Sequence, residues 1–136
     1  MCFDTNVLIF ALSNTRDDLS SKVADILFDC ANTIFVSSIA VQELILLYKI
    51  GKMKNLRFKS EAAMLDAIKD LRYEIVFFNE YHFAKYTKLE IVEGHKDMND
   101  HAIIAQAMTE KIALISSDKE FANYTAQGLN FVFNKR

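Results

Sequence analysis

The sequence contains no proline and only three glycines among its 136 residues. Phosphate-binding loops of the P-loop and dinucleotide-binding kinds need clustered glycines after a strand, so nucleotide binding by those motifs is excluded. Gly51, Gly94 and Gly128 each follow a helical stretch. We expect each of them to end a helix in the left-handed conformation that glycine tolerates.

Cysteines and long hydrophobic runs are also scarce. Cys2 and Cys30 are too few for a disulfide scaffold. Together with three scattered histidines they also do not form a structural zinc motif, so we expect both cysteines to carry reduced thiol groups. The longest apolar run, Val7 to Leu12, has six residues, whereas a membrane-spanning helix needs about 20. The segment before it has neither the basic start nor the apolar stretch of a secretory signal. We therefore expect no membrane span and a cytoplasmic protein.

The composition is that of a globular chain with nearly balanced charge. Hydrophobic residues make up 51%, and 16 Lys and Arg against 18 Asp and Glu give a net charge of −2. Such a chain can bury a core and differs from disordered sequences. Its length predicts that residues 1–136 form a single domain. Without a global positive field, contact with a nucleic acid must come from a local basic patch.

Short apolar runs alternate along the chain with longer segments of helical periodicity. The strand candidates are Cys2-Phe3, Ile34 to Val36, Ile75 to Phe78, Ile112 to Ile115 and Phe131 to Phe133. The helices are marked by apolar residues at helical spacing: Val23, Ile26, Leu27 and Cys30; Val41, Leu44, Ile45 and Tyr48; Met64, Ile68 and Leu71; Phe83 and Tyr86; Ile103, Ile104, Ala107 and Met108; and Phe121 and Tyr124. This alternation predicts an α/β fold, a three-layer α/β/α sandwich with a parallel sheet of about five strands.

Carboxylates follow the predicted strands at the edge where open parallel sheets bind ligands. Asp4 follows the first strand, Asp118 follows the fourth, and Glu43 lies in the helix after the second. Asp97 and Asp100 open the helix that precedes the fourth strand. Each acid taken singly also has a structural explanation, since aspartates commonly cap helices or favour the helix dipole, and a helix glutamate is commonly solvated. The convergence of Asp4, Glu43, Asp100 and Asp118 favours a functional site.

Four acids without a neighbouring cysteine suit a hard cation. Mg²⁺ and Mn²⁺ prefer carboxylate and water oxygens, so the predicted metal is one of these and not zinc. Such an ion lowers the pKa of a water molecule and neutralises charge that develops on a phosphoryl group. The acids therefore favour metal-assisted hydrolysis.

Four segments stand out in order along the chain: Asp4-Thr5-Asn6-Val7-Leu8, Val41-Gln42-Glu43-Leu44, the block from His95 to Ala107, and Ser116-Ser117-Asp118-Lys119-Glu120-Phe121. Together they resemble the ordered motifs of the PIN-domain family, specifically its VapC branch of toxin–antitoxin ribonucleases. The resemblance covers nearly the whole chain. The opening motif is weakly specific alone, but the middle block and the late Ser-x-Asp together are much more specific.

The resemblance implies a PIN fold and a metal-dependent endoribonuclease. The acids that catalyse and bind metal would be Asp4, Glu43, Asp100 and Asp118, with Asn6 and Ser116 as supporting polar residues, and Asp97 as either a supporting residue or a helix cap. Water would be the attacking group, which leaves a 5′-phosphate and a 3′-hydroxyl on the RNA. The resemblance further implies a homodimer that binds a small antitoxin, for which a cationic antitoxin side chain in the acidic pocket is a plausible inhibitory contact.

This sequence departs from the family pattern in three places. Only three residues precede Asp4, so we expect a short first strand. Members commonly carry proline where Met98 stands and arginine where His101 stands, and loss of that arginine would weaken phosphate contacts without removing a metal ligand. His95 and His101 flank the acidic block and are candidate proton carriers.

A basic run follows the helix that carries Glu43. It comprises Lys49, Lys52, Lys54, Arg57 and Lys59, with no acid among residues 49–59. The run is a candidate for binding the RNA backbone. A solvated surface loop explains it equally well.

Two alternative functions remain open at this point. A phosphohydrolase of the haloacid-dehalogenase kind would use an aspartate after the first strand as nucleophile, but such enzymes place a second aspartate where Asn6 stands. A trapped aspartyl-phosphate would identify that class. A non-catalytic PIN-like module that binds RNA or protein would retain RNA affinity without cleavage, and the complete set of acids counts against it.

Overall fold

The structure is a computed structural model that describes residues 1–13, 18–53 and 58–135. Its elements are β1 (Cys2–Phe3), α1 (Thr5–Leu12), α2 (Ser21–Phe28), β2 (Phe35–Ser37), α3 (Ser38–Lys49), α4 (Glu61–Asp70), β3 (Glu74–Val76), α5 (Glu80–Lys88), α6 (Met98–Glu110), β4 (Leu114–Ser116), the 3₁₀ helix η2 (Lys119–Gln127) and β5 (Phe131–Phe133). Strands and helices thus alternate along the chain.

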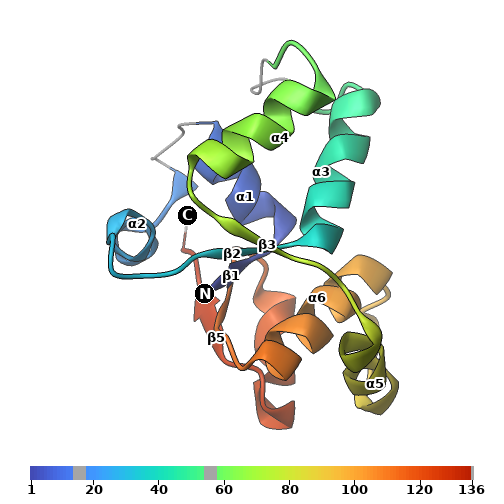
Figure 1. Cartoon of the computed structure of the whole chain (residues 1–136). Coiled ribbons are helices and arrows are strands. Elements are labelled where there is room, and N and C mark those ends of the chain that lie inside the picture. The colour runs from blue at the N-terminus through green and yellow to red at the C-terminus, as the bar shows by residue number, and fades with distance from the viewer. Residues whose placement is uncertain (14–17, 54–57, 136) are drawn as a thin grey trace.

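The strands form one parallel sheet in the order β3-β2-β1-β4-β5. β1 lies in the centre, where Cys2 pairs with Phe35 of β2 on one side and with Leu114 of β4 on the other. In Figure 1, α1, α3 and α4 lie above the sheet and α5 and α6 lie below it. The predicted α/β fold with a parallel sheet of about five strands is confirmed, and β1 is as short as expected.

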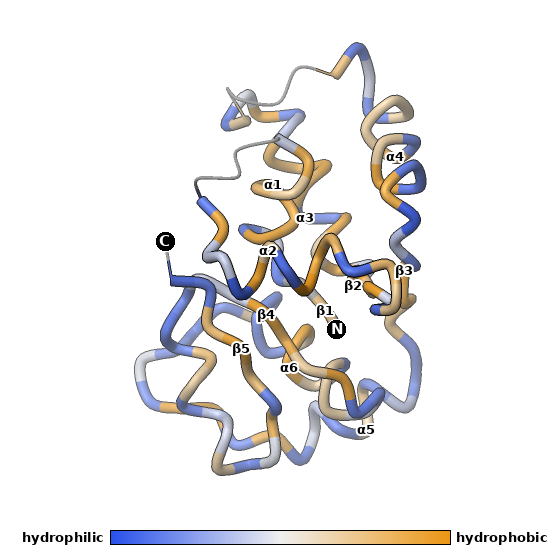
Figure 2. The backbone as a smooth tube through the Cα atoms, turned by 90° about the vertical axis from the view of Figure 1, so that its left-hand side faces the viewer, coloured by the Kyte–Doolittle hydropathy of each residue, from blue (hydrophilic) through white to orange (hydrophobic). Residues whose placement is uncertain are grey.

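The hydrophobic core is built from both faces of the sheet. Leu8 of α1, Leu44 of α3, Ile103 and Ile104 of α6 and Ile115 of β4 are all fully buried. Figure 2 shows hydrophobic segments in the centre of the molecule, along α1, α3, β4 and α6, with hydrophilic segments at the periphery. Within the described ranges, no helix combines the length and the hydrophobicity needed to cross a bilayer.

Three local expectations differ from the structure. The strand expected at Ile75 to Phe78 ends at Val76, because the backbone N–H of Phe78 donates to Ser38 Oγ and so leaves the ladder. β2 and β4 begin and end one or two residues later than expected, whereas β1 and β5 have the expected bounds. The prediction for Gly94 was wrong: it lies at φ +85° in the turn before His95, six residues beyond the end of α5.

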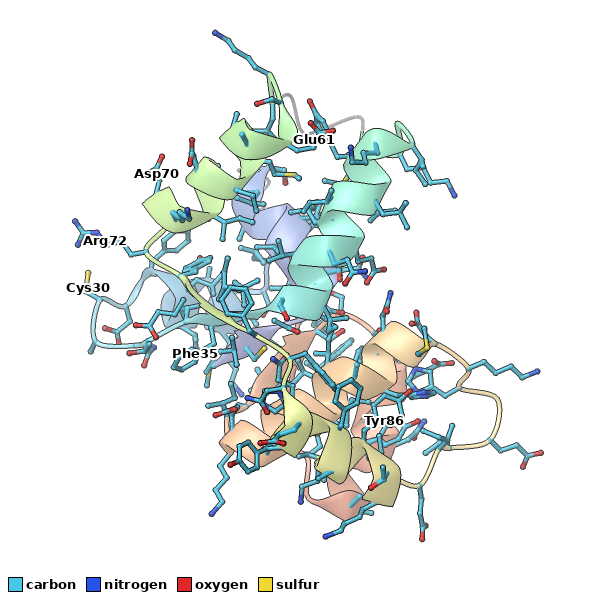
Figure 3. The ribbon with its side chains drawn as sticks, turned by 45° about the vertical axis from the view of Figure 1, so that its right-hand side comes forward. Cys30, Phe35, Glu61, Asp70, Arg72 and Tyr86 are labelled. Atoms are coloured by element: carbon cyan, nitrogen blue, oxygen red, sulfur yellow. The ribbon has the colours of Figure 1, made fainter. Side chains whose placement is uncertain are left out.

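Gly51 and Gly128 do follow helices at positive φ, as expected, whereas α6 ends at Lys111 with φ +55°. The face that α5 buries also differs from the apolar pattern. His82 is fully buried and Phe83 is exposed. The ring of His82 accepts the N–H of the helix cap Asn79 at Nδ1, and its Nε2 lies 2.7 Å from Glu110 of α6, so this side of α5 faces α6. Tyr86 of the same helix points toward α6 (Figure 3).

Candidate active site

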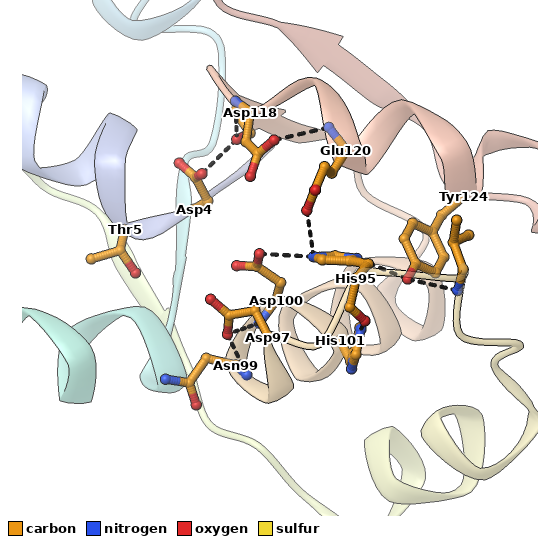
Figure 4. A network of polar contacts seen from close by, with 12 residues as sticks. Asp4, Thr5, His95, Asp97, Asn99, Asp100, His101, Asp118, Glu120 and Tyr124 are labelled. Carbon is orange, nitrogen blue, oxygen red and sulfur yellow. Dashed lines mark hydrogen bonds and ion pairs between the residues drawn. The ribbon is translucent and has the colours of Figure 1, made fainter.

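Asp4, Asp100 and Asp118 come together at the carboxyl edge of the sheet, each at the start of a helix. Asp4 follows β1 and caps α1, with its Oδ1 accepting the N–H of Val7 at 3.0 Å. Asp118 caps η2 by accepting the N–H of Glu120 at 2.9 Å, and Asp100 is the third residue of α6. Figure 4 shows the three carboxylates around a common space. Three helix N-termini, whose partial charge is positive, therefore converge on one acidic site.

Ser116 connects two of these carboxylates. It is the last residue of β4, the strand paired with β1, and it is fully buried. Its hydroxyl donates to Asp4 Oδ2 and accepts the N–H of Asp118 at 2.9 Å. The side chain of Ser116 therefore holds Asp4 and the start of η2 in a defined relation, and its supporting role in the reaction stays a prediction.

The pKa values of two of the acids are raised. The pKa of Asp4 is raised to about 6, chiefly by burial and in smaller part by the charges of Asp100 and Asp118, against hydrogen bonds from Ser116 and from the backbone of Val7. The pKa of Asp100 is also raised to about 6, chiefly by burial and in smaller part by the charges of Asp97 and Asp118, against the hydrogen bond and charge of His95. Buried acids that repel one another are typical of sites that take a cation.

Replacing Ser116 with alanine should raise the pKa of Asp4 above its value of about 6, because the hydroxyl donates to the charged form of this carboxylate. The measurement is a ¹³C NMR titration of the carboxyl groups in metal-free protein. Ser117→Ala is the matched control, since the Ser117 hydroxyl accepts from Asn134 and is not bonded to Asp4. An unchanged Asp4 titration in Ser116→Ala would contradict the coupling.

Glu43 lies on α3 and is half-buried beside α1. Its Oε2 accepts the hydroxyl of Thr5 at 2.8 Å. Because Thr5 directly follows Asp4, this bond links Glu43 to the segment that carries Asp4. Thr5 was not predicted as a site residue, although it stands in the opening Asp-Thr-Asn motif.

Asp97 and Asn6 lie at the margin of the site. Asp97 is exposed and caps α6, accepting the backbone N–H groups of Asn99 at 2.9 Å and Asp100 at 3.2 Å. Of the two roles left open for Asp97, this geometry favours the cap. Asn6 is exposed in the first turn of α1. Its supporting role stays a prediction.

The two histidines of the middle block are buried behind Asp100. His95 Nε2 lies 3.0 Å from Asp100 Oδ2 and 3.4 Å from Glu120 Oε2. His101 donates from Nε2 to the carbonyl of His95 at 2.9 Å, so it does not take the exposed position that a phosphate-binding arginine would need. Tyr124, whose hydroxyl lies 2.8 Å from His95 Nδ1, was predicted only as part of a helix face. The proton-carrier role of the histidines stays a prediction.

The basic run begins at Lys49, the last residue of α3, and the structure describes only part of it. Lys49 pairs with Glu61 at 3.2 Å, although the run itself contains no acid. Lys52 and Lys59 are exposed. Lys54 and Arg57 lie outside the described residues. The role of the run in RNA binding stays a prediction.

The donor chemistry of the site fits a hard divalent cation. Among the described residues, no group of three or more Asp, Glu, His or Cys side chains is arranged to hold a metal ion as it stands. Within the same ranges, however, no hydrogen bond reaches Asp100 Oδ1 or Asp118 Oδ2, while the other oxygen of each carboxylate has a partner. The available donors are therefore carboxylate oxygens, which Mg²⁺ and Mn²⁺ prefer.

Comparisons with known proteins agree with this fold. The family model described as PIN domain matches residues 1–127. A search of the curated proteins finds no match. The chain is similar to a structure of VapBC2 from Rickettsia felis bound to a DNA fragment from their promoter, with 21% identity, a TM-score of 0.66 and 98% of each chain covered.

Two further solved structures are similar over nearly their full length. FitAcB from Neisseria gonorrhoeae has 22% identity and a TM-score of 0.60, covering 98% of this chain and 96% of that chain. VapBC-1 from nontypeable Haemophilus influenzae has 18% identity and a TM-score of 0.65, covering 97% of this chain and 96% of that chain. At these identities the likeness concerns the fold.

Proposed function

The chain belongs to the PIN domain family, and we propose that it is a metal-dependent endoribonuclease that acts as the toxin of a toxin–antitoxin pair. In this proposal residues 1–136 form one domain that hydrolyses RNA phosphodiester bonds in the cytoplasm. Asp4, Glu43, Asp100 and Asp118 are the catalytic and metal-binding residues, and the metal is Mg²⁺ or Mn²⁺.

One observation carries the proposal: a buried acid, Asp4, and half-buried acids from separate segments gather at the carboxyl edge of a parallel sheet. Burial and mutual repulsion raise the pKa of Asp4 and of Asp100 to about 6. Holding like charges together in this way costs folding free energy, which a bound cation offsets. A purely structural role for the caps would not require the acids to converge.

The chain's own residues have separable parts in the reaction. Asp4, Asp100 and Asp118 would hold the cation, with Glu43 beside them. The cation, when bound, would neutralise charge that develops on the phosphoryl oxygens and acidify a water molecule. Ser116 keeps Asp4 in place, and Thr5 keeps Glu43 in place. The N-termini of α1, α6 and η2 direct their positive ends toward the site, which favours an anionic phosphate there.

The RNA strand outside the reacting phosphate would be bound by the basic run. Lys52 and Lys59 are exposed and available for phosphate contacts, whereas Lys49 forms an ion pair with Glu61. Contacts of this kind depend on salt and carry no sequence information. Lys54 and Arg57 belong to the same proposal by sequence alone.

A homodimer and a small antitoxin complete the proposal. The named neighbours VapBC2 and VapBC-1 share their fold with this chain, and its motifs resemble the VapC branch. Exposed apolar side chains are available for a partner, among them Leu46 of α3, Ile50 directly after α3 and Phe83 of α5.

Purified protein incubated with total RNA tests the proposed function. We expect cleavage in Mg²⁺ or Mn²⁺, no cleavage in excess chelator, and products with 5′-phosphate and 3′-hydroxyl ends, because water is the attacking group. Cleavage that persists in chelator, or products with 2′,3′-cyclic ends, would contradict this mechanism. RNA binding without cleavage under all metal conditions would favour the non-catalytic binding module.

A further inference from the structure

His95 occupies a buried position between α6 and η2 that the metal-binding proposal does not use. It follows Gly94 in the loop before α6, and only 4% of its side chain is exposed. Its ring packs at a centroid distance of 5.4 Å from Tyr124 and 4.7 Å from His101. Both ring nitrogens have polar partners. A buried imidazole held this tightly has a defined orientation.

The partners of His95 determine which ring nitrogen carries a proton toward Asp100. Tyr124 has one hydroxyl proton, and its oxygen already accepts the N–H of Val92 at 3.2 Å. The phenol proton is therefore available to His95 Nδ1, which lies 2.8 Å away. Nε2 lies near the carboxylates of Asp100 and Glu120, which accept hydrogen bonds when ionised. When these carboxylates are ionised, Nε2 is the nitrogen that carries the proton, both in the neutral and in the cationic ring.

We propose that His95 is the positioning residue for Asp100, held between Tyr124 and His101 so that its Nε2–H fixes the orientation of this carboxylate. The bond engages Asp100 Oδ2 and leaves Oδ1 for the space shared with Asp4 and Asp118 (Figure 4). Tyr124 lies on η2, the helix that Asp118 caps, and Asp100 lies on α6. The chain Tyr124–His95–Asp100 therefore sets the relation between two of the acids.

His101 supports this arrangement from the helix side. Its Nε2 donates to the backbone carbonyl of His95 at 2.9 Å, so α6 holds the loop that carries His95. The histidine that stands where the family pattern has arginine thus has a different use in this chain. The inference rests on the proposed function, because it assigns Asp100 to the metal site.

Mn²⁺ affinity of the intact protein tests the inference without measuring catalysis. Hydrogen bonds that orient metal-binding carboxylates commonly account for 10- to 100-fold in metal affinity. We expect His95→Phe, which keeps a ring but has no donor, to weaken Mn²⁺ binding by about 10-fold or more. His95→Gln retains an amide donor and should restore most of that loss. Calorimetric titration at pH 7.5 gives the dissociation constants, and circular dichroism checks the fold.

His82→Phe is the matched control. His82 is also a buried histidine beside a carboxylate, with Nε2 2.7 Å from Glu110, but Glu110 is the last residue of α6 and lies away from the acidic site. The His82→Phe variant should keep its Mn²⁺ affinity within about 2-fold of wild type, a smaller change than the 10-fold expected when an orienting partner is lost. Unchanged affinity in His95→Phe, or an equal loss in His82→Phe, would overturn the positioning role.

A metal-free measurement separates this inference from the proposed function. Ring ¹⁵N chemical shifts, assigned with His95→Gln, should show a protonated Nε2 in His95, and Asp100→Asn should change that shift. If wild type bound no Mn²⁺, the proposed metal site would fail, whereas these shifts would still support the His95–Asp100 bond. An unprotonated Nε2, or a shift that Asp100→Asn leaves unchanged, would overturn the inference.

Discussion

Replacing Asp4 or Asp100 with asparagine should lower the rate of RNA cleavage by about 1000-fold. Charge stabilisation by a bound metal is worth several kcal/mol in phosphoryl chemistry, and each factor of ten in rate corresponds to about 1.4 kcal/mol. Asparagine is a good helix cap and keeps the oxygen that accepts the N–H of Val7, so the start of α1 should persist in Asp4→Asn. Initial rates on a short RNA in saturating Mg²⁺ give the comparison.

Two control variants separate the site from acidic residues in general. Asp97→Asn alters an exposed cap only three residues from Asp100 and should stay within a few-fold of wild type, because asparagine caps about as well as aspartate. Asp66→Asn changes an exposed acid on α4 and should have no effect. Wild-type rates in both Asp4→Asn and Asp100→Asn would remove these residues from catalysis.

The order of the elements could be predicted from the sequence because the inner strands β2 and β4 are largely buried and the edge strands β3 and β5 are half-buried. Each apolar run then differs clearly from the amphipathic helices around it. The ends of the strands could not be predicted in the same way. Phe77 and Phe78 continue the apolar run beyond β3, but the backbone of Phe78 bonds to Ser38 on α3, and only the folded chain brings these residues together.

The convergence of acids could be predicted for a related reason. Asp4 and Asp118 directly follow strands, and the register of a parallel sheet brings strand ends to one edge. The capping explanation and the site are moreover compatible, since Asp4 and Asp118 cap helices that begin at the site. The contacts that orient the acids were not predictable. Thr5 to Glu43 spans 38 positions, and Tyr124 to His95 spans 29, so neither leaves a periodic signal.

The titration of Asp4 and Asp100 should lower the free energy of unfolding of the metal-free protein as the pH rises from about 4 to 7. Their folded-state pKa of about 6 lies above the ordinary value of 3.8. Between these values the folded chain keeps protons that the unfolded chain has lost, so raising the pH favours unfolding. A pKa shift from 3.8 to about 6 lowers the free energy of unfolding by about 3 kcal/mol for each acid whose titration is fully linked to folding, at about 1.4 kcal/mol per pKa unit.

Of wild type and Asp4→Asn, the more stable protein at pH 7 should be the variant in chelator and wild type when Mg²⁺ is added. In chelator the variant should be the more stable protein, because it removes a buried charge while keeping the cap; the lost hydrogen bond from Ser116 offsets about 1 kcal/mol of that gain. With Mg²⁺ at 100 times its dissociation constant, wild type should gain about 2.7 kcal/mol and the variant much less.

Chemical denaturation of both proteins at pH 4.5 and pH 7, with Mg²⁺ and with chelator, measures these differences. At pH 4.5 the two proteins should be nearly equal in chelator, because Asp4 is then largely protonated when folded. If Asp4 only capped α1, asparagine would serve equally well, and the two proteins would stay equal at every pH and metal concentration. Equal stability throughout, together with no gain of wild type in Mg²⁺, would therefore leave Asp4 as a helix cap. A reversal confined to pH 7 would identify its carboxylate as a charge that the fold keeps for a cation.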